Sequence, residues 1–206
     1  MKLLIFGATG GTGRQLVAQA LAQGHHVTAF VRRPKAITTQ HANLTVVQGD
    51  ITDAAAINRA VAGHDVVLSA LGTRGGTAVL PEGTRQILAA MRAHGIRRSI
   101  WVTSFGVGDS LQQMNWFAQT VIVKGFLRKA IEEKELQEKI IMADDSDWII
   151  VRPGGLTDGP LAGKYRVTGP GDKVGRPTIS RADVADFMLR NLTDTRYVRK
   201  AVGLTY

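Results

Sequence analysis

The chain reads Gly7-Ala8-Thr9-Gly10-Gly11-Thr12-Gly13 immediately after a short apolar run, Leu3–Phe6. Its glycines at positions 7, 10 and 13 form the pattern GxxGxxG, and a helical stretch follows. In a strand–turn–helix unit, the first glycine permits the tight turn and the second lets the backbone approach a pyrophosphate. The third lets the helix pack closely on the strand, and unpaired N–H groups at the helix N-terminus attract phosphates. The stretch therefore predicts a dinucleotide-binding turn.

The remaining residues of the turn are expected to serve the same site. Thr9 and Thr12 can add hydroxyl donors, and Gly11 is expected among the cofactor-binding residues. A mononucleotide P-loop is excluded because no Gly-Lys-Ser/Thr follows the glycines. The alternative is a glycine-rich turn without a ligand, and the strand–turn–helix context favours a cofactor.

The end of the second expected strand, Phe30-Val31-Arg32-Arg33-Pro34, indicates which dinucleotide binds. A site that prefers NAD usually has an acidic residue here, hydrogen-bonded to the ribose hydroxyls. An arginine instead offers a planar, charged fork to a 2′-phosphate. We therefore predict NADPH or NADP as the cofactor, with Arg32 and Arg33 at its 2′-phosphate. The alternative is two solvated surface arginines.

Short apolar runs alternate with helical patterns along the whole chain. Strands are expected at Lys2–Phe6, His26–Val31, Leu44–Gln48, Asp65–Ala70, Ser99–Thr103 and Asp147–Val151, with Ala201–Thr205 closing the sheet edge. Helices are expected at Gly13–Gln23, Ala54–Val61, Glu82–His94, within Phe117–Ala143, and at Arg181–Leu192 with Ser180 as its N-cap. This order predicts an α/β fold, a Rossmann-type doubly wound parallel sheet in a single domain over residues 1–206. The long irregular segment Leu156–Thr178 is expected at the carboxyl edge of the sheet, where ligands bind.

Two further segments follow expected strands at this edge. Asp50 can accept a hydrogen bond from the adenine amino group while Ile51 packs on the ring, and Asp53 is expected to cap the next helix. After the fourth expected strand, Ala70-Leu71-Gly72-Thr73 forms a bend rich in small residues, which would let the nicotinamide ribose approach the backbone.

The composition limits the other functions that this chain can have. It has 206 residues, a net charge of +9 and no cysteine, so disulfides, thiolate nucleophiles and cysteine-based zinc sites are excluded. The basic residues are scattered, no apolar run approaches the roughly 20 residues of a membrane span, and the five histidines lack metal-ligand spacing. We expect no nucleic acid, membrane or metal partner, and a cytoplasmic location.

Several motifs together resemble the atypical short-chain dehydrogenase/reductases, an NAD(P)H-binding, NmrA-like branch, and within it the flavin reductases, also called biliverdin-IXβ reductases. The likeness is carried by Phe6–Gly10, Val31-Arg32, Leu71–Arg74, Met91–Gly95, Thr103-Ser104, Pro160–Tyr165 and Phe187–Arg190. The resemblance implies hydride transfer from NADPH to flavin (FMN, FAD or riboflavin), and to biliverdin or quinone-like acceptors. It also implies that Ser104 is the catalytic residue at the nicotinamide. Further cofactor contacts are expected from Thr103, Pro153, Gly154 and Gly155, at the ends of the fifth and sixth strands.

The chain lacks the usual proton donors of related enzymes. Classical members of the superfamily carry a tyrosine four residues before a lysine, and Ala130 stands four residues before Lys134. Alcohol oxidation is therefore disfavoured, whereas reduction of a conjugated ring needs no such acid because its charge delocalises. Lys134 is either a solvated helix lysine within a charged face or a contact to the cofactor ribose.

Ser104 and three aromatic residues each have two roles open to them. Ser104 either hydrogen-bonds the nicotinamide or acceptor, or caps a loop. The aromatic residues Trp116, Phe117 and Phe126 form either core or a pocket wall.

A non-catalytic NADPH-binding sensor or assembly factor is the alternative function of the protein. For the enzyme we expect a small-molecule acceptor as partner and a monomer or weak dimer.

Overall fold

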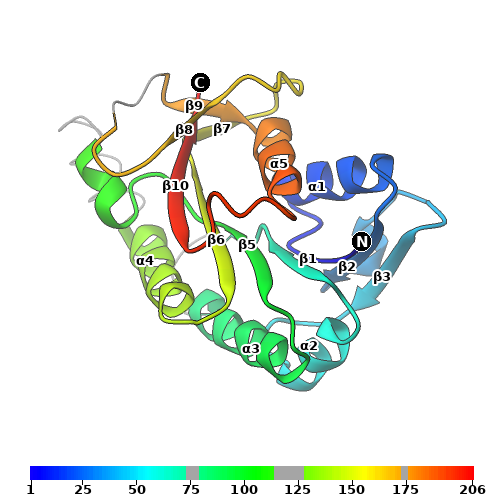
Figure 1. Ribbon diagram of the computed structural model, residues 1–206. Coiled ribbons are helices and arrows are strands. Elements are labelled where there is room, and N and C mark those ends of the chain that lie inside the picture. The colour runs from blue at the N-terminus through cyan, green and yellow to red at the C-terminus, as the bar shows by residue number, and fades with distance from the viewer. Residues whose placement is uncertain (73–78, 114–127, 173–175) are drawn as a thin grey trace.

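A mostly parallel, eight-stranded sheet organises the chain in the order β3-β2-β1-β4-β5-β6-β10-β8 (Figure 1). The structure, a computed structural model, describes residues 1–72, 79–113, 128–172 and 176–206. The strands are β1 (Lys2–Phe6), β2 (His26–Val31), β3 (Leu44–Gln48), β4 (Val66–Ser69), β5 (Arg98–Val102), β6 (Asp147–Pro153), β7 (Gly155–Thr157), β8 (Arg166–Thr168), β9 (Thr178–Ser180) and β10 (Lys200–Thr205). The helices are α1 (Gly11–Ala22), α2 (Ala54–Val61), α3 (Val79–Ala93), α4 (Arg128–Met142) and α5 (Arg181–Arg190), with 3₁₀ turns η1 (Pro34–Ala36) and η2 (Gly108–Gln113). The predicted Rossmann-type fold is confirmed.

The order of the strands reverses between β1 and β4. From β1 the chain builds outward to β2 and β3 on one side, and then returns to β4, β5 and β6 on the other. In open parallel sheets the loops at such a switch point separate and leave a crevice for a ligand. The glycine turn follows β1 and therefore lies at this point.

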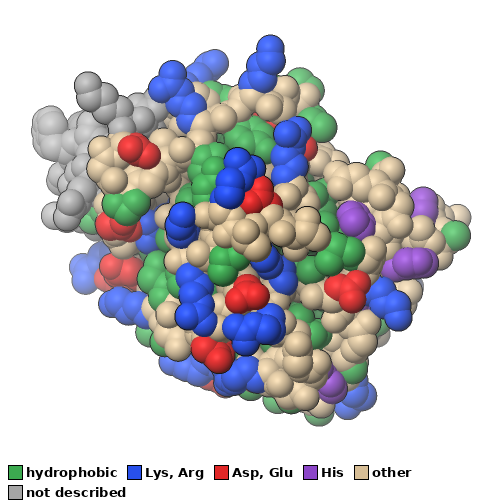
Figure 2. Space-filling view, viewed as in Figure 1, with side chains coloured by type: hydrophobic (Ala, Val, Ile, Leu, Met, Phe, Trp, Pro, Cys, Tyr) green, Lys and Arg blue, Asp and Glu red, His purple; other side chains and the backbone are tan. Residues whose placement is uncertain are grey.

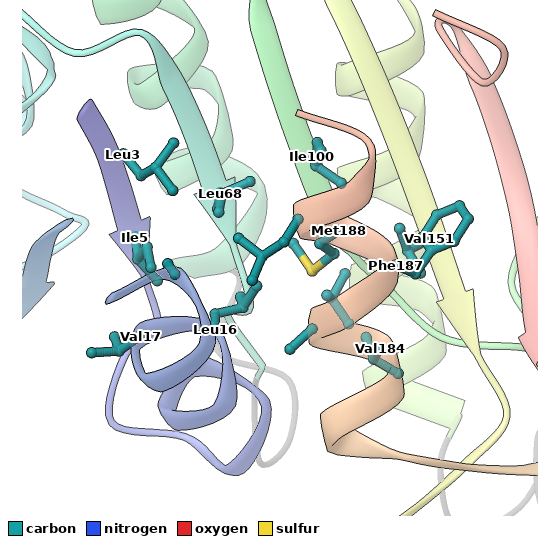
Figure 3. Packing of buried hydrophobic residues seen from close by; sticks show 14 of the residues in the cluster. Leu3, Ile5, Leu16, Val17, Leu68, Ile100, Val151, Val184, Phe187 and Met188 are labelled. Atoms are coloured by element: carbon teal, nitrogen blue, oxygen red, sulfur yellow. The ribbon is translucent and has the colours of Figure 1, made fainter. Parts of the chain in front are cut away.

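Helices cover both faces of the sheet. The apolar core on one face joins α1 and α5 to the strands, and Leu16 and Met188 point from these two helices toward the sheet (Figure 3). The core on the other face includes Trp101 and is covered by residues of α2, α3 and α4. The central strands β1 and β4 are almost entirely apolar because both of their faces are buried.

Two helices begin with the side-chain caps that the sequence predicts. The Asp53 carboxylate accepts from the Ala56 N–H at 2.9 Å, and the Ser180 hydroxyl accepts from the Asp183 N–H at 3.0 Å. Each cap satisfies a donor that the first turn of a helix leaves unpaired.

The C-terminal half differs from the prediction in two ways. β10 was expected at the sheet edge, but it lies inside the sheet, parallel to β6 and antiparallel to the edge strand β8. The expected irregular segment Leu156–Thr178 contains β8, and its ends belong to β7 and β9, which pair as a small second sheet. These strands have only three residues each, too few for an alternating pattern to reveal them.

Some expectations lie outside the described residues, namely those on Thr73, Arg74, Trp116, Phe117 and Phe126. Among the described residues, no helix has a stretch long and apolar enough to cross a membrane. Figure 2 shows Lys and Arg side chains in several places on one face of the molecule, with Asp and Glu among them.

Candidate functional site

The glycine turn is shaped by two close backbone approaches. Gly7 has a φ of +79°, and a Cβ there would lie 2.6 Å from the carbonyl oxygen of Ala70. A Cβ at Gly13 would overlap the carbonyl oxygen of Gly7 and lie 2.8 Å from the Cα of Ala8. These two glycines therefore have the turn and packing roles that the sequence predicts for them.

The N-terminus of α1 presents its backbone at the mouth of the turn. Gly10 is the N-cap and supplies no side-chain cap, Gly11 begins the helix, and the first turn contains no acidic residue. The positive end of the helix dipole is thus not neutralised within its own first turn. Thr12 is buried and Thr9 half-buried, and the Arg14 side chain donates from Nε to the Thr9 carbonyl at 3.1 Å. This end of α1 is suited to an anion.

The ends of β2 and β3 bring charged side chains together. Arg32 and Arg33 are exposed, and neither guanidinium group makes a hydrogen bond or ion pair with any residue that the structure describes. Asp50 accepts from the N–H and hydroxyl of Thr52 at 3.0 and 2.9 Å. The Thr52 N–H, with smaller contributions from the hydroxyl and the charge of Arg32, lowers the pKa of Asp50 although burial opposes the shift. The two guanidinium groups can therefore receive a phosphate beside an ionised carboxylate.

The remaining predicted contacts of this half differ in exposure. Ile51 is half-buried against α3, where a Cβ added to Gly83 would lie 2.9 Å from its Cδ1, so part of its surface is already covered. Leu71 is half-buried, whereas Gly72 is exposed, and a Cβ there would meet no atom of the described residues within 4 Å. The space beside Gly72 agrees with the expected approach of a ribose.

A buried ion-pair network lies beneath the ends of β5 and β6. Arg152 donates from Nε and Nη2 to the two carboxylate oxygens of Glu138 at 3.0 and 2.7 Å, and from Nη1 to Asp109. The Thr103 hydroxyl donates to the same Glu138 carboxylate at 2.6 Å. Thr103 was expected at the cofactor, but its hydroxyl is held inside this network because the buried carboxylate needs donors. The network connects the residue after β5 to β6, α4 and η2.

Ser104 directly follows Thr103 of this network, in the loop after β5. It is half-buried, and its hydroxyl donates to the Phe105 carbonyl at 3.1 Å. The next turn is fixed by Ser110, whose hydroxyl accepts from the Gly106 N–H at 3.0 Å and donates to the Val107 carbonyl at 2.6 Å. These hydrogen bonds hold the loop in place. The contact of the Ser104 hydroxyl with the neighbouring Phe105 carbonyl is the local, loop-capping one of its two predicted roles.

Pro153, Gly154 and Gly155 serve the connection between the two sheets. Pro153 is the last residue of β6, and the Gly155 N–H donates to the Pro177 carbonyl at 2.8 Å. A Cβ at Gly154 would lie 2.8 Å from that same carbonyl oxygen. The glycines are therefore required by close packing of the chain, and their expected contact with the cofactor stays a prediction.

Lys134 does not lie on a solvated face. It is half-buried on α4, next to the buried Glu133 and four residues before the buried Glu138, so the interpretation as a solvated helix lysine is wrong for this residue. Burial lowers the pKa of the Lys134 ammonium from 10.5 to about 8, against the raising effect of Glu138 and Glu133. Tertiary packing against α3 explains the difference, because Glu133 accepts from the Leu80 N–H at 3.1 Å.

Replacing Lys134 with methionine is expected to stabilise the protein at pH 7. A lysine whose pKa is lowered on folding binds fewer protons in the folded state between pH 8 and 10.5, so stability rises with pH there. The advantage of Lys134→Met should be largest below pH 8 and shrink toward pH 10.5. Urea unfolding of both proteins at pH 7 and pH 10 checks this, and an equal difference at both values would contradict the burial of the charge.

Three functional candidates were not found from the sequence. Arg14 directly follows Gly13, and this position next to the glycine turn could have indicated a role in the cofactor site. Glu138 and Arg181 gave no local signal, because the residues that they contact are far away in the chain. Arg181 lies against Gly11, at the opening of α1.

A hollow of about 290 Å³ opens between η2 and α4, close to the loop that carries Ser104. Its lining includes Gly106, Leu111 and Ile131, with Arg128 and Glu132 among the polar residues. A hollow with apolar walls and a few polar groups is suited to a small organic molecule.

Comparison with known proteins agrees with this geometry. Residues 7–195 match a protein-family model described as NAD(P)H-binding. An uncharacterised chloroplastic protein of Arabidopsis thaliana is 31% identical over 98% of this chain and 76% of its own length. A 3 beta-hydroxysteroid dehydrogenase/Delta 5-->4-isomerase of Mycobacterium tuberculosis is 29% identical over 75% of this chain, which spans only 47% of that protein. The solved structure of ChuY from Escherichia coli O157:H7, described as an anaerobillin reductase, has a TM-score of 0.85 and 28% identity, covering 100% of this chain and 97% of the other.

Proposed function

The chain belongs to the NAD(P)H-binding family, and we propose that within it the chain is an NADPH-dependent reductase that transfers hydride to flavin. An NAD(P)H-dependent oxidoreductase is the class of function that the family and its relatives support. The observation that carries the proposal is the glycine turn at the switch point of the sheet, with Arg32 beside it at the end of β2.

The preference for NADPH rests on charge at the end of β2. Arg32 and Arg33 are exposed, and the acidic residue that would bind the ribose hydroxyls of NADH is absent from this position. A guanidinium forms short, charge-assisted hydrogen bonds with a phosphate. We assign the 2′-phosphate to these two residues and the diphosphate to the N–H groups that open α1.

Bound NADPH supplies a hydride to the acceptor ring, whose negative charge delocalises, and a solvent proton completes the reduction. The residues of the chain have the task of holding two rings in contact. Gly72 leaves room for the nicotinamide ribose, and the Ser104 hydroxyl can exchange its Phe105 partner for the nicotinamide amide or the acceptor. The Arg152 network holds the Ser104 loop in position.

A linear tetrapyrrole such as biliverdin is the second candidate acceptor. It is favoured by the likeness to ChuY, a protein described as an anaerobillin reductase, over the full length of this chain. Both acceptors are conjugated and can take hydride without a protein acid.

When the protein is mixed with NADPH and either FMN or biliverdin, the absorbance of the reduced nicotinamide is expected to decrease as NADPH is oxidised. NADH should react much more slowly, and Arg32→Ala should lower kcat/KM for NADPH about tenfold while leaving that for NADH nearly unchanged. Arg85→Ala, at an exposed arginine of α3 paired with Glu82, is the matched control and should change neither.

Two results would contradict parts of this proposal. An unchanged preference for NADPH over NADH in Arg32→Ala would show that the 2′-phosphate assignment is wrong. Tight NADPH binding with no turnover of either acceptor would favour the non-catalytic sensor over the reductase.

A further inference from the structure

Arg181, the first residue of α5, lies against the opening of α1. Its Cδ and Nε would be only 2.5 and 2.6 Å from a Cβ at Gly11, so the absence of a side chain there is what admits the arginine. The two helices pack on the same face of the sheet (Figure 3), and the Gln19 amide donates to the Ala182 carbonyl at 3.0 Å. The fold thus brings a guanidinium from the C-terminal part of the chain to the first turn of α1.

The ion pair between Arg181 and its charged partner, Asp158, is weak. Arg181 Nη1 lies 2.7 Å from Asp158 Oδ1, and the Asp158 side chain is 88% exposed against 27% for Arg181. An ion pair so open to water contributes little, because solvent screens it. A diphosphate at the same place would carry more charge and would also interact with the positive end of the α1 dipole.

The segment that carries Asp158 is fixed close to this position. The Asp183 carboxylate accepts from the N–H groups of Ala162 and Gly163 at 3.0 and 2.8 Å, and the Thr157 hydroxyl donates to the Ile179 carbonyl at 3.4 Å. Asp158 therefore remains near Arg181, where its negative charge opposes the approach of an anion to the glycine turn.

We propose that Arg181 binds the diphosphate of NADPH, and that Asp158 competes with the cofactor for the same guanidinium. The inference rests on the proposed function in that it requires NADPH to bind at the glycine turn. It assigns Gly11 a role separate from the GxxGxxG pattern, which is to make room for the arginine. It also links cofactor binding to the Gly155–Tyr165 segment, because this segment carries the competing carboxylate.

Titration calorimetry with NADPH and with adenosine 2′-monophosphate tests this, since the second nucleotide keeps the 2′-phosphate but lacks the diphosphate. Arg181→Gln should weaken NADPH binding about tenfold, the loss expected for one charge-assisted hydrogen bond, and leave adenosine 2′-monophosphate unchanged. Arg181→Lys should recover part of the NADPH affinity because it restores the charge. Asp158→Asn should have the opposite effect and strengthen NADPH binding about threefold.

Arg190→Gln is the matched control, because Arg190 lies at the other end of α5 and is likewise paired with an aspartate, Asp186, at 2.8 Å. It should leave the affinity for both nucleotides unchanged. NADPH affinity within twofold of wild type in Arg181→Gln would overturn the inference, as would an equal loss for both nucleotides, which would mean that Arg181 acts through the fold of the turn. Wild-type protein that binds NADPH but reduces no acceptor would remove the proposed function and leave this inference standing.

Discussion

Gly13→Ala is expected to disrupt both the fold of the first βα unit and the binding of NADPH. The added Cβ would overlap the carbonyl oxygen of Gly7 and crowd the Cα of Ala8, and both are backbone atoms that cannot rotate away. The helix must therefore move away from β1. This movement disturbs the packing around Leu16 and Ile5, which are both fully buried. Overpacking of this kind costs about 1–3 kcal/mol of unfolding free energy. Urea unfolding followed by circular dichroism measures the loss.

Gly10→Ala is the control from the same turn. A Cβ there would lie 3.4 Å from the Gly7 carbonyl oxygen, close to ordinary contact, and Gly10 has a φ of −73° that any residue adopts. We expect this variant to fold but to bind NADPH more weakly, because the side chain lies where the diphosphate meets the backbone. Equal stability of Gly13→Ala and wild type would show that the third glycine is not required for packing.

Glu138→Gln is expected to lower the free energy of unfolding by about 3–5 kcal/mol, although it changes almost no volume. Glu138 and Arg152 are each only 3% exposed, and the carboxylate receives both arms of the guanidinium and the Thr103 hydroxyl. Without this charge, the buried guanidinium keeps only Asp109 as a charged partner among the described residues. The half-exposed Asp109 alone compensates the buried guanidinium poorly, and a buried charge that is poorly compensated is costly because water cannot reach it.

Two further variants separate the buried network from ordinary surface pairs. Glu132→Gln removes an exposed pair with Arg128 on the same helix and should cost less than about 0.5 kcal/mol. The double variant Glu138→Leu with Arg152→Met removes both buried charges and should recover at least half of the loss. If Glu138→Gln costs no more than Glu132→Gln, the network does not stabilise the fold.

The fold and the centre of the site could be predicted because their signals are local. The GxxGxxG turn stands between an apolar strand and a helix, and alternation of strands and helices leaves few topologies open. The caps at Asp53 and Ser180 were also predictable, since each side chain accepts from an N–H three residues later. The three-residue strands β7, β8 and β9 were missed because they are defined by hydrogen bonds to strands elsewhere in the chain. The sequence of each short segment does not show which strand it will pair with.

What the sequence determined by itself was therefore the strand–turn–helix backbone that can bind a diphosphate, with two arginines following β2. Only the tertiary structure decided which other charges meet there. Glu133 and Glu138 look like solvated helix residues in the sequence, but both are buried, Glu133 against α3 and Glu138 beside the ends of β5 and β6. Arg181 reaches Gly11 because α1 and α5 cover the same face of the sheet. Such contacts join residues distant in the chain, so no periodic pattern predicts them, and they arise only when the sheet brings its helices together.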